Sequence, residues 1–224
     1  VACELEFAQA VRDGLVVDYS EACAVVRRLI RRIEEKLGRT LLTAAIAVPP
    51  GTDTRSCDTH RHVVESAGPE VIMCLDEPTA ANAVLNIRDG VIVDIGGGTT
   101  GLSVLENGVV TYTADEPTGG THLTLVLSGS YGISIDEAET IKKDYSRHRE
   151  IFPVIKPVLE KMASIIRTHI KGRGVTDIYL VGGTCCLTGM ENVIAKETGL
   201  SVAKPSNPFL VTPLGIALNC AFKN

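Results

Sequence analysis

The sequence lacks tryptophan altogether, and only 4% of its 224 residues are aromatic. It also lacks an apolar run of the roughly 18 residues that a membrane-spanning helix needs, and no charged-then-apolar leader opens it. Acidic residues outnumber basic ones by 27 to 22, which gives a formal charge of −5, and long basic runs are missing. These absences argue against membrane insertion and against nonspecific nucleic-acid binding, and they favour a cytoplasmic protein.

Cysteine pairs of the CxxC type are absent too, although the sequence contains seven cysteines. An odd number of scattered cysteines in a chain of this size predicts reduced thiols rather than a disulfide framework. Cys57, His60 and His62 lie close together in a polar segment. A structural zinc site needs four ligands, however, and no fourth ligand lies nearby. We therefore interpret these three residues as part of the solvated face of a helix.

What the sequence does contain is enough apolar material for a core, at 45% of its residues, in a length that suits one large domain or two small lobes. Apolar spacing predicts helices over 20–37, 52–67, 78–85, 122–128, 136–145, 157–171, 190–198 and 213–221. Short apolar runs predict strands over 43–48, 71–75, 91–94, 102–105, 109–113 and 178–181. The dipeptide Asn107-Gly108 predicts a hairpin turn. Strands interleaved with helices indicate an α/β architecture.

Three glycine clusters follow or adjoin these strands. They are Gly96-Gly97-Gly98 before Thr99, Gly119-Gly120 before Thr121, and Gly182-Gly183 before Thr184. Glycine after a strand lets successive backbone N–H groups converge on an anion, and a neighbouring threonine hydroxyl can bond an oxyanion. One such turn is a weak signal, because glycine also simply makes turns. Three in one chain favour a nucleotide phosphate site.

The first cluster formally matches the GxGxxG pattern of dinucleotide-binding folds. Such a fold requires a helix directly after the glycines, to receive the pyrophosphate. Here Gly101 is followed by an apolar strand, a turn and another strand, so the loop joins two strands of a hairpin. A P-loop is excluded as well, because no cluster ends in Gly-Lys followed by Ser or Thr. The site therefore belongs to another class of phosphate-binding hairpin.

Four motifs resemble, in the same order, those of the actin-like ATPase superfamily, which includes actin, the DnaK-type chaperones, sugar kinases and bacterial actin homologues. Residues 91–105 resemble its second phosphate hairpin, and residues 76–83 its first connecting helix. Residues 178–190 resemble its adenosine motif, and residues 213–217 its second connecting helix. The resemblance implies an actin-like ATPase (ribonuclease H-like) fold, with two lobes around a nucleotide cleft and with ATP and Mg²⁺ as cofactors.

The resemblance also implies roles for residues at the phosphate end of the nucleotide. Asp94 would hold Mg²⁺, and the phosphates would be cradled by Gly96, Gly97, Gly98 and Thr99. Glu77 would orient a water molecule and, with Thr99, form the catalytic part of the site. For Glu77 a plainer alternative stays open, since an acid at the start of a helix also complements the helix dipole.

At the adenosine end, the resemblance implies a nucleotide-facing helix with Glu139, Lys142, Lys143 and Ser146. A solvated helix with ion pairs is an equally good interpretation of these four residues. The α-phosphate and base would face Gly182, Gly183 and Thr184, and Gly119 and Gly120 would add a third phosphate turn.

Two departures from the family pattern bear on activity. The Asp-x-Gly-Thr sequence of the family's first phosphate hairpin is missing, and we expect it to precede Val1. Hydrolysis depends on positioning from both sides, so the resemblance implies at most a slow ATP phosphohydrolase. In addition, Cys186 stands where the chaperones place an arginine that stacks on the base. A thiol cannot stack as a planar cation, which predicts weaker adenine binding.

The resemblance divides the chain into lobe I, residues 1–90 plus 208–224, and lobe II, residues 91–207. Within the superfamily, the short length and the motifs look most like the chaperone-like members of ethanolamine utilisation. This implies a nucleotide-dependent two-lobe switch acting on a protein partner, either an ethanolamine-degrading enzyme or a shell component of its microcompartment. Three alternatives stay open: a bacterial actin-like scaffold of the cell-division or pilus type, a sugar or acetate kinase, and a pseudo-ATPase that binds nucleotide without turnover.

Overall fold

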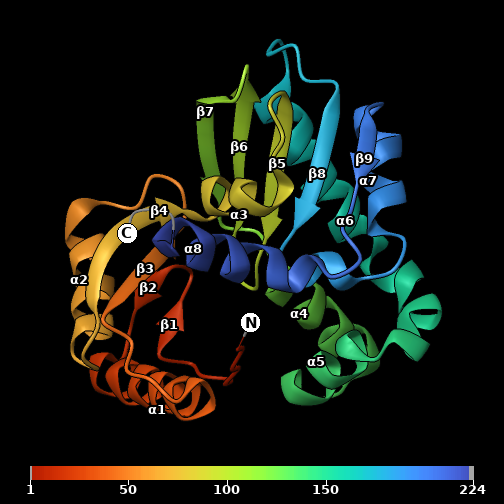
Figure 1. The fold of residues 1–224 in the computed structure, drawn as a ribbon. Helices are drawn as coiled ribbons and strands as arrows, with labels where there is room; N and C mark the ends of the chain where they lie inside the picture. Colours follow the sequence, from red (N-terminus) through yellow and green to blue (C-terminus); the bar gives the residue numbers. More distant parts are fainter. Residues whose placement is uncertain (1, 222–224) are drawn as a thin grey trace.

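The computed structural model describes residues 2–221, so residue 1 and residues 222–224 of the predicted lobe I lie outside the described residues. Two helices, α3 (Glu77–Leu85) and α8 (Val211–Ala221), lie side by side at the centre of the molecule (Figure 1). They separate an N-terminal part, residues 2–76, from a C-terminal part, residues 86–210. No helix among residues 2–221 combines the length and the apolar character needed to cross a membrane.

The N-terminal part contains two small sheets and two helices. Its elements are β1 (Val11–Arg12), β2 (Leu15–Val16), α1 (Tyr19–Leu37), β3 (Thr43–Val48), α2 (Thr54–Glu65) and β4 (Glu70–Asp76). β1 pairs with β2 as an antiparallel hairpin, whereas β3 and β4 are parallel. Asp18 and Asp53 begin the two helices by accepting hydrogen bonds from backbone N–H groups of the first turn. The predicted helices and strands of this region are confirmed, while the two-residue strands β1 and β2 are too short to give a periodic signal.

The C-terminal part is built on a mixed five-stranded sheet. Its strands, in spatial order, are β7 (Val109–Glu116), β6 (Thr100–Glu106), β5 (Gly90–Ile95), β8 (Asp177–Val181) and β9 (Ser201–Ala203). β5, β6 and β7 form an antiparallel meander, and β8 and β9 continue the sheet in parallel with β5. The predicted turn between β6 and β7 is confirmed, since Asn107 and Gly108 both have positive φ, as a tight hairpin requires.

Helices cover both faces of this sheet, which explains why β5 is buried along its whole length. The helical elements are α4 (Gly120–Tyr131), α5 (Ile135–Lys143), η1 (Tyr145–Arg147), α6 (His148–Ile170), η2 (Gly183–Cys186), α7 (Met190–Thr198) and η3 (Pro208–Leu210). Val91, Val93 and Ile95 of β5 face α4, α6 and α7. Ile92 faces the opposite way, toward α3 and α8. Because side chains alternate along a strand, Asp94 also points toward α8.

One predicted helix start in the C-terminal part is wrong by nine residues, and one strand was not predicted. The helix expected from Pro157 begins at His148, with Pro153 and Pro157 inside it. An interior proline costs about 3 kcal/mol, but Ile151 and Ile155 continue the buried stripe of this helix and are fully enclosed by the core. Their burial outweighs that cost. The unpredicted strand is β9, because three residues at a sheet edge are too few to show an alternating pattern.

The cysteines also differ from expectation at one pair. Cys57 of α2 and Cys74 of β4 are joined as a disulfide, so the prediction of reduced thiols fails for these two residues. No sequence pattern indicates this pairing, because the two cysteines become neighbours only when α2 packs against β4. Five further cysteines are free thiols: Cys3, Cys23, Cys185, Cys186 and Cys220.

Candidate nucleotide site

The three glycine clusters meet at one point, the ends of β5 and β8. The carbonyl oxygen of Gly96 accepts hydrogen bonds from the Gly120 N–H at 2.9 Å and from the Thr184 hydroxyl at 2.7 Å. The Thr121 N–H donates to the Gly97 carbonyl at 2.8 Å. A Cβ at Gly119 would lie only 2.6 Å from the Gly97 carbonyl oxygen, so this close approach requires glycine. Residues separated by almost ninety positions in the sequence thus form a single wall.

The loop between β5 and β6 presents unused backbone donors on this wall. Within residues 2–221, the amide N–H groups of Gly97, Gly98 and Thr99 donate no hydrogen bond to the protein. Gly97 is exposed, and Gly98 and Thr99 are partly exposed. Successive N–H groups at a glycine-rich turn form a nest for an anion. In contrast, the Gly120 N–H and the Thr184 hydroxyl are engaged within the wall, so these groups shape the site and do not face a ligand.

Asp94, the predicted metal ligand, is the second-to-last residue of the buried strand β5, just before this loop. Its side chain accepts a hydrogen bond from the Thr212 hydroxyl of α8 at 2.5 Å. Burial raises the pKa of Asp94, and the bond from Thr212 opposes that effect in part. The carboxylate therefore links the sheet of the C-terminal part to α8, and a nearby cation would favour its charged form.

Glu77 begins α3 and is half-buried beside Asp94. Burial, followed by the charges of Asp94, Asp115 and Asp76, raises the pKa of Glu77 to about 8. Asp115, near the end of β7, was not predicted as a site residue. One of its carboxylate oxygens is buried without a hydrogen-bond partner, and burial raises its pKa as well. We call Glu77, Asp94 and Asp115 the acidic cluster.

Counting residues from the hairpin turn at Asn107-Gly108 does not find Asp115. The pairing of β6 with β7 shifts by one residue between Val104 and Leu105, and this irregularity places Asp115 opposite Gly101, only a few residues from the phosphate loop. No local motif of the sequence indicates this shift. A second acid, Asp13 at the tip of the β1–β2 hairpin, comes from the N-terminal part and lies directly against Gly98.

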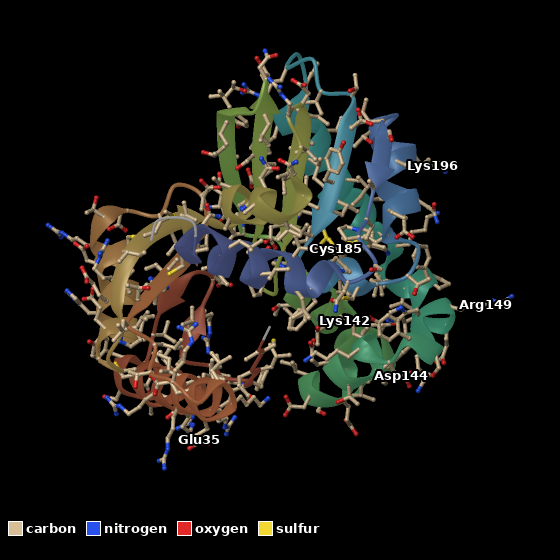
Figure 2. The ribbon with its side chains drawn as sticks, in the orientation of Figure 1. Glu35, Lys142, Asp144, Arg149, Cys185 and Lys196 are labelled. Carbon is tan, nitrogen blue, oxygen red and sulfur yellow. A yellow bond between two sulfur atoms is a disulfide. The ribbon has the colours of Figure 1, made fainter. Side chains whose placement is uncertain are left out.

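A cavity of about 350 Å³ opens next to the glycine wall. It brings together six of the predicted site residues: Gly97, Glu139, Lys142, Lys143, Gly183 and Thr184. Figure 2 places Lys142 and Cys185 near the point where β8 ends and α8 passes, whereas Asp144 lies further out. Ser146 does not line the cavity; its hydroxyl bonds to Asp144 at 2.7 Å on the surface. The remaining lining includes Tyr145, Cys186 and Phe209, of which the first and last were not predicted.

Lys142 and Glu139 form the polar wall of this cavity. The Lys142 ammonium is 2.7 Å from Glu139, and it also donates to the Gly120 carbonyl and to the Thr124 hydroxyl of α4. Burial lowers the pKa of Lys142, and Glu139 offsets part of that effect. Burial would raise the pKa of Glu139, but hydrogen bonds from Lys142 and Thr124 outweigh it and lower the pKa. The alternative of a solvated helix face is therefore wrong for Lys142, although Lys143 is exposed.

The chemistry of these groups fits a phosphate chain and a divalent cation. Free backbone N–H groups suit phosphate oxygens, and carboxylates that raise one another's pKa are relieved by a metal. Among residues 2–221, no group of three or more His, Cys, Asp or Glu side chains is arranged to enclose a metal by itself.

Comparison with known proteins agrees with this geometry. The family model of type IV pilus assembly protein PilM matches residues 57–215. The chain is 45% identical over 218 residues to ethanolamine utilization protein EutJ of Escherichia coli, covering 97% of this chain and 77% of that protein. The crystal structure of EutJ from Carboxydothermus hydrogenoformans, 53% identical, superposes with a TM-score of 0.89 over 95% of this chain and 79% of that one. The PilM–PilN type IV pilus biogenesis complex shares the fold at a TM-score of 0.80 and 15% identity, over 97% of this chain and 90% of that one.

The fold is that of the actin-like ATPase superfamily, as the sequence resemblance implied. Within this superfamily, the 45% identity to EutJ of Escherichia coli across nearly the whole chain identifies the family. The chain belongs to the EutJ family of ethanolamine utilisation proteins.

Proposed function

We propose that this protein binds ATP with Mg²⁺ between its two parts and acts as a nucleotide-dependent switch on a protein partner in the cytoplasm. The convergence of the three glycine clusters on the Gly96 carbonyl carries this proposal, because it builds an anion nest at the end of two neighbouring strands. Similarity to the ethanolamine utilization protein of E. coli supports a role in ethanolamine utilisation. We infer that the partner is an ethanolamine-degrading enzyme or a microcompartment shell component.

In this proposal each part of the site has a distinct task. The amides of Gly97, Gly98 and Thr99 donate hydrogen bonds to phosphate oxygens. Asp94 and Asp115 would hold Mg²⁺, and the cation would supply charge neutralisation for the phosphates. Glu77, half-buried at the start of α3, orients a water molecule beside the phosphates. The complex of PilM with PilN supports a protein partner for a protein of this fold.

Asp94→Asn tests the metal part of this proposal. The amide keeps the acceptor for Thr212 but loses the charge, so the affinity for ATP with Mg²⁺ should fall about ten- to hundredfold. In excess chelator the variant and the unchanged protein should bind ATP equally well. Titration calorimetry measures both affinities, and Asp58→Asn, on the exposed face of α2, is the matched control. If Asp94→Asn binds ATP with Mg²⁺ as tightly as the unchanged protein does, the metal role is refuted, and no ATP binding by the unchanged protein would refute the function.

A further inference from the structure

A second cavity lies between α6 and α7 in the C-terminal part, apart from the glycine wall. Its volume is about 530 Å³, larger than that of the cavity beside the wall. Gly189, which precedes α7, keeps it open: its φ of +87° suits glycine, and a Cβ there would lie 3.3 Å from the Phe152 ring. Phe152, Pro153 and Val193 give the cavity an apolar lining. We call it the α6–α7 groove.

The groove carries positive charge and no negative charge. Arg149 and Lys196 line it, and no Asp or Glu of residues 2–221 does. Both side chains are exposed, and Figure 2 shows them at the edge of the C-terminal part that faces away from the N-terminal part. Neither forms an ion pair within the described part of the chain, whereas Arg147 and Lys204, which lie outside the groove, are each paired with a glutamate. In a chain with a formal charge of −5, two unpaired cations beside an apolar surface indicate an acidic ligand.

His148 connects the groove with the cavity beside the glycine wall, because it lines both. The imidazole is buried, at 4% exposure. Its Nδ1 accepts a hydrogen bond from the Thr188 N–H at 3.1 Å, so its proton is on Nε2, which donates to the Lys142 carbonyl at 3.0 Å. Thr188 lines the groove and Lys142 lines the other cavity. A ligand in the groove therefore contacts residues that are bonded to the wall of the candidate nucleotide site.

We propose that the α6–α7 groove docks an acidic peptide segment of the partner protein. This inference rests on the proposed function and identifies the surface that the partner contacts. An apolar side chain of the segment packs on Phe152, and its carboxylates pair with Arg149 and Lys196. The apolar contact supplies most of the affinity, whereas the two cations select an acidic segment over a basic one. Two cations are too few for a nucleic acid, whose binding needs many phosphate contacts.

Selection from a phage-displayed library of random peptides, with the whole chain as bait, tests this proposal. The enriched peptides should carry Asp or Glu around an apolar residue, and fluorescence anisotropy of a labelled enriched peptide then measures its affinity. Arg149→Glu and Lys196→Glu place a negative charge at the groove, so each should weaken binding by about tenfold or more. Both positions are exposed, so the fold tolerates the change. Lys161→Glu, at an exposed position of α6 outside the groove, changes the net charge equally and is the matched control.

Weaker binding by both groove variants, with Lys161→Glu like the unchanged protein, supports the docking groove. Enriched peptides that are basic or uncharged, equal binding by all variants, or no enriched peptide at all overturns it. Self-association of the unchanged chain that Lys196→Glu abolishes in sedimentation also overturns it, since the groove would then hold a second copy. Titration of the same samples with ATP and Mg²⁺ separates the two proposals. ATP binding without peptide binding overturns the groove alone, and peptide binding without ATP binding overturns the proposed function alone.

Discussion

Glu77 stands at the start of α3, where a glutamate ordinarily stabilises a helix because its negative charge faces the positive end of the dipole. Its surroundings disfavour the charged form of the side chain. Burial and the neighbouring carboxylates raise its pKa to about 8, so the side chain is largely neutral near neutral pH. A residue that only complements a dipole has no reason to be placed among Asp94, Asp115 and Asp76. Strongly shifted acids gather at functional sites, which favours the site interpretation of Glu77.

This shift makes the stability of the free protein depend on pH. The folded state keeps the Glu77 proton to higher pH than the unfolded chain, so this contribution to stability is fully present below the ordinary pKa of 4.5 and is lost as the pH rises to about 8. Glu77→Gln mimics the protonated form at every pH. We expect it to match the unchanged protein at about pH 5 and to exceed it by on the order of a few kcal/mol at about pH 9. Urea unfolding across this range measures the difference.

The control for this experiment is Glu70→Gln, an exposed glutamate on β4. It should leave the pH dependence of the unfolding free energy unaltered. Parallel curves for Glu77→Gln and the unchanged protein would show that Glu77 is charged in the fold across the range, and would contradict the raised pKa.

Which of these residues could be read from the sequence depends on how local their signal is. Asp94 and the glycines that follow it form one continuous motif, and the structure places them together at the end of β5. The position of Asp115 at the site depends on the register of two strands, and the positions of Tyr145 and Phe209 depend on how η1 and η3 pack around η2. A short stretch of sequence gives no information on such packing. Ser146 shows the opposite error, since it fits a motif but lies outside the cavity.

At the scale of elements, the pair α3 and α8 joins the two parts of the molecule. The two helices can touch because small residues lie where they cross: a Cβ on Gly215 of α8 would collide with the backbone carbonyl of Ala80, which is fully buried in α3. α3 carries Glu77 at its start and α8 carries Thr212, the partner of Asp94. A change in the spacing of these helices would therefore move Glu77 of the acidic cluster relative to Thr212, the partner of Asp94.

Gly215→Ala tests this crossing. Alanine is the better helix former by about 1 kcal/mol, but the added methyl group meets backbone that cannot move aside, and overpacking costs about 1–3 kcal/mol. We expect a net loss of stability in urea unfolding. Gly129→Ala in α4, where nothing lies within 4 Å of the new methyl group, should instead gain about 0.5–1 kcal/mol. A gain in both variants would mean that the helices do not pack at Gly215.

The bounds of helices and strands were predicted well where local sequence determines them. They were predicted less well where packing in the core determines them. β3, flanked by residues that stop a strand, has the predicted bounds of residues 43–48. α6 extends nine residues beyond its predicted start, because core contacts of Ile151 and Ile155 override two prolines. The disulfide between Cys57 and Cys74 was also missed because it depends on tertiary packing, here of α2 on β4.

On the scale of the whole molecule, the cavity and the phosphate nest differ in which part they touch. The residues that line the cavity run from Gly97 to Phe209 and all belong to the C-terminal part. The nest, in contrast, adjoins the N-terminal part, since Asp13 of the β1–β2 hairpin lies against Gly98 and Pro50 lies against Gly101. A ligand that fills only the cavity is held by one part. A ligand with a phosphate chain long enough to reach Gly98 contacts both, which is what a switch requires.

AMP and ATP should therefore have different effects on the N-terminal part. At equal occupancy, both nucleotides should slow hydrogen exchange around the cavity, in η2 and α5, but only ATP with Mg²⁺ should slow it in the β1–β2 hairpin, Val11–Val16. Mass spectrometry of peptides from each region measures the difference, and α7, which lies outside the cavity, is the internal reference. Equal protection of the hairpin by AMP and ATP, or no protection by either, would mean that the phosphate chain does not couple the two parts. The protein would then be a static nucleotide-binding module, because a two-part switch must register the γ-phosphate in both parts.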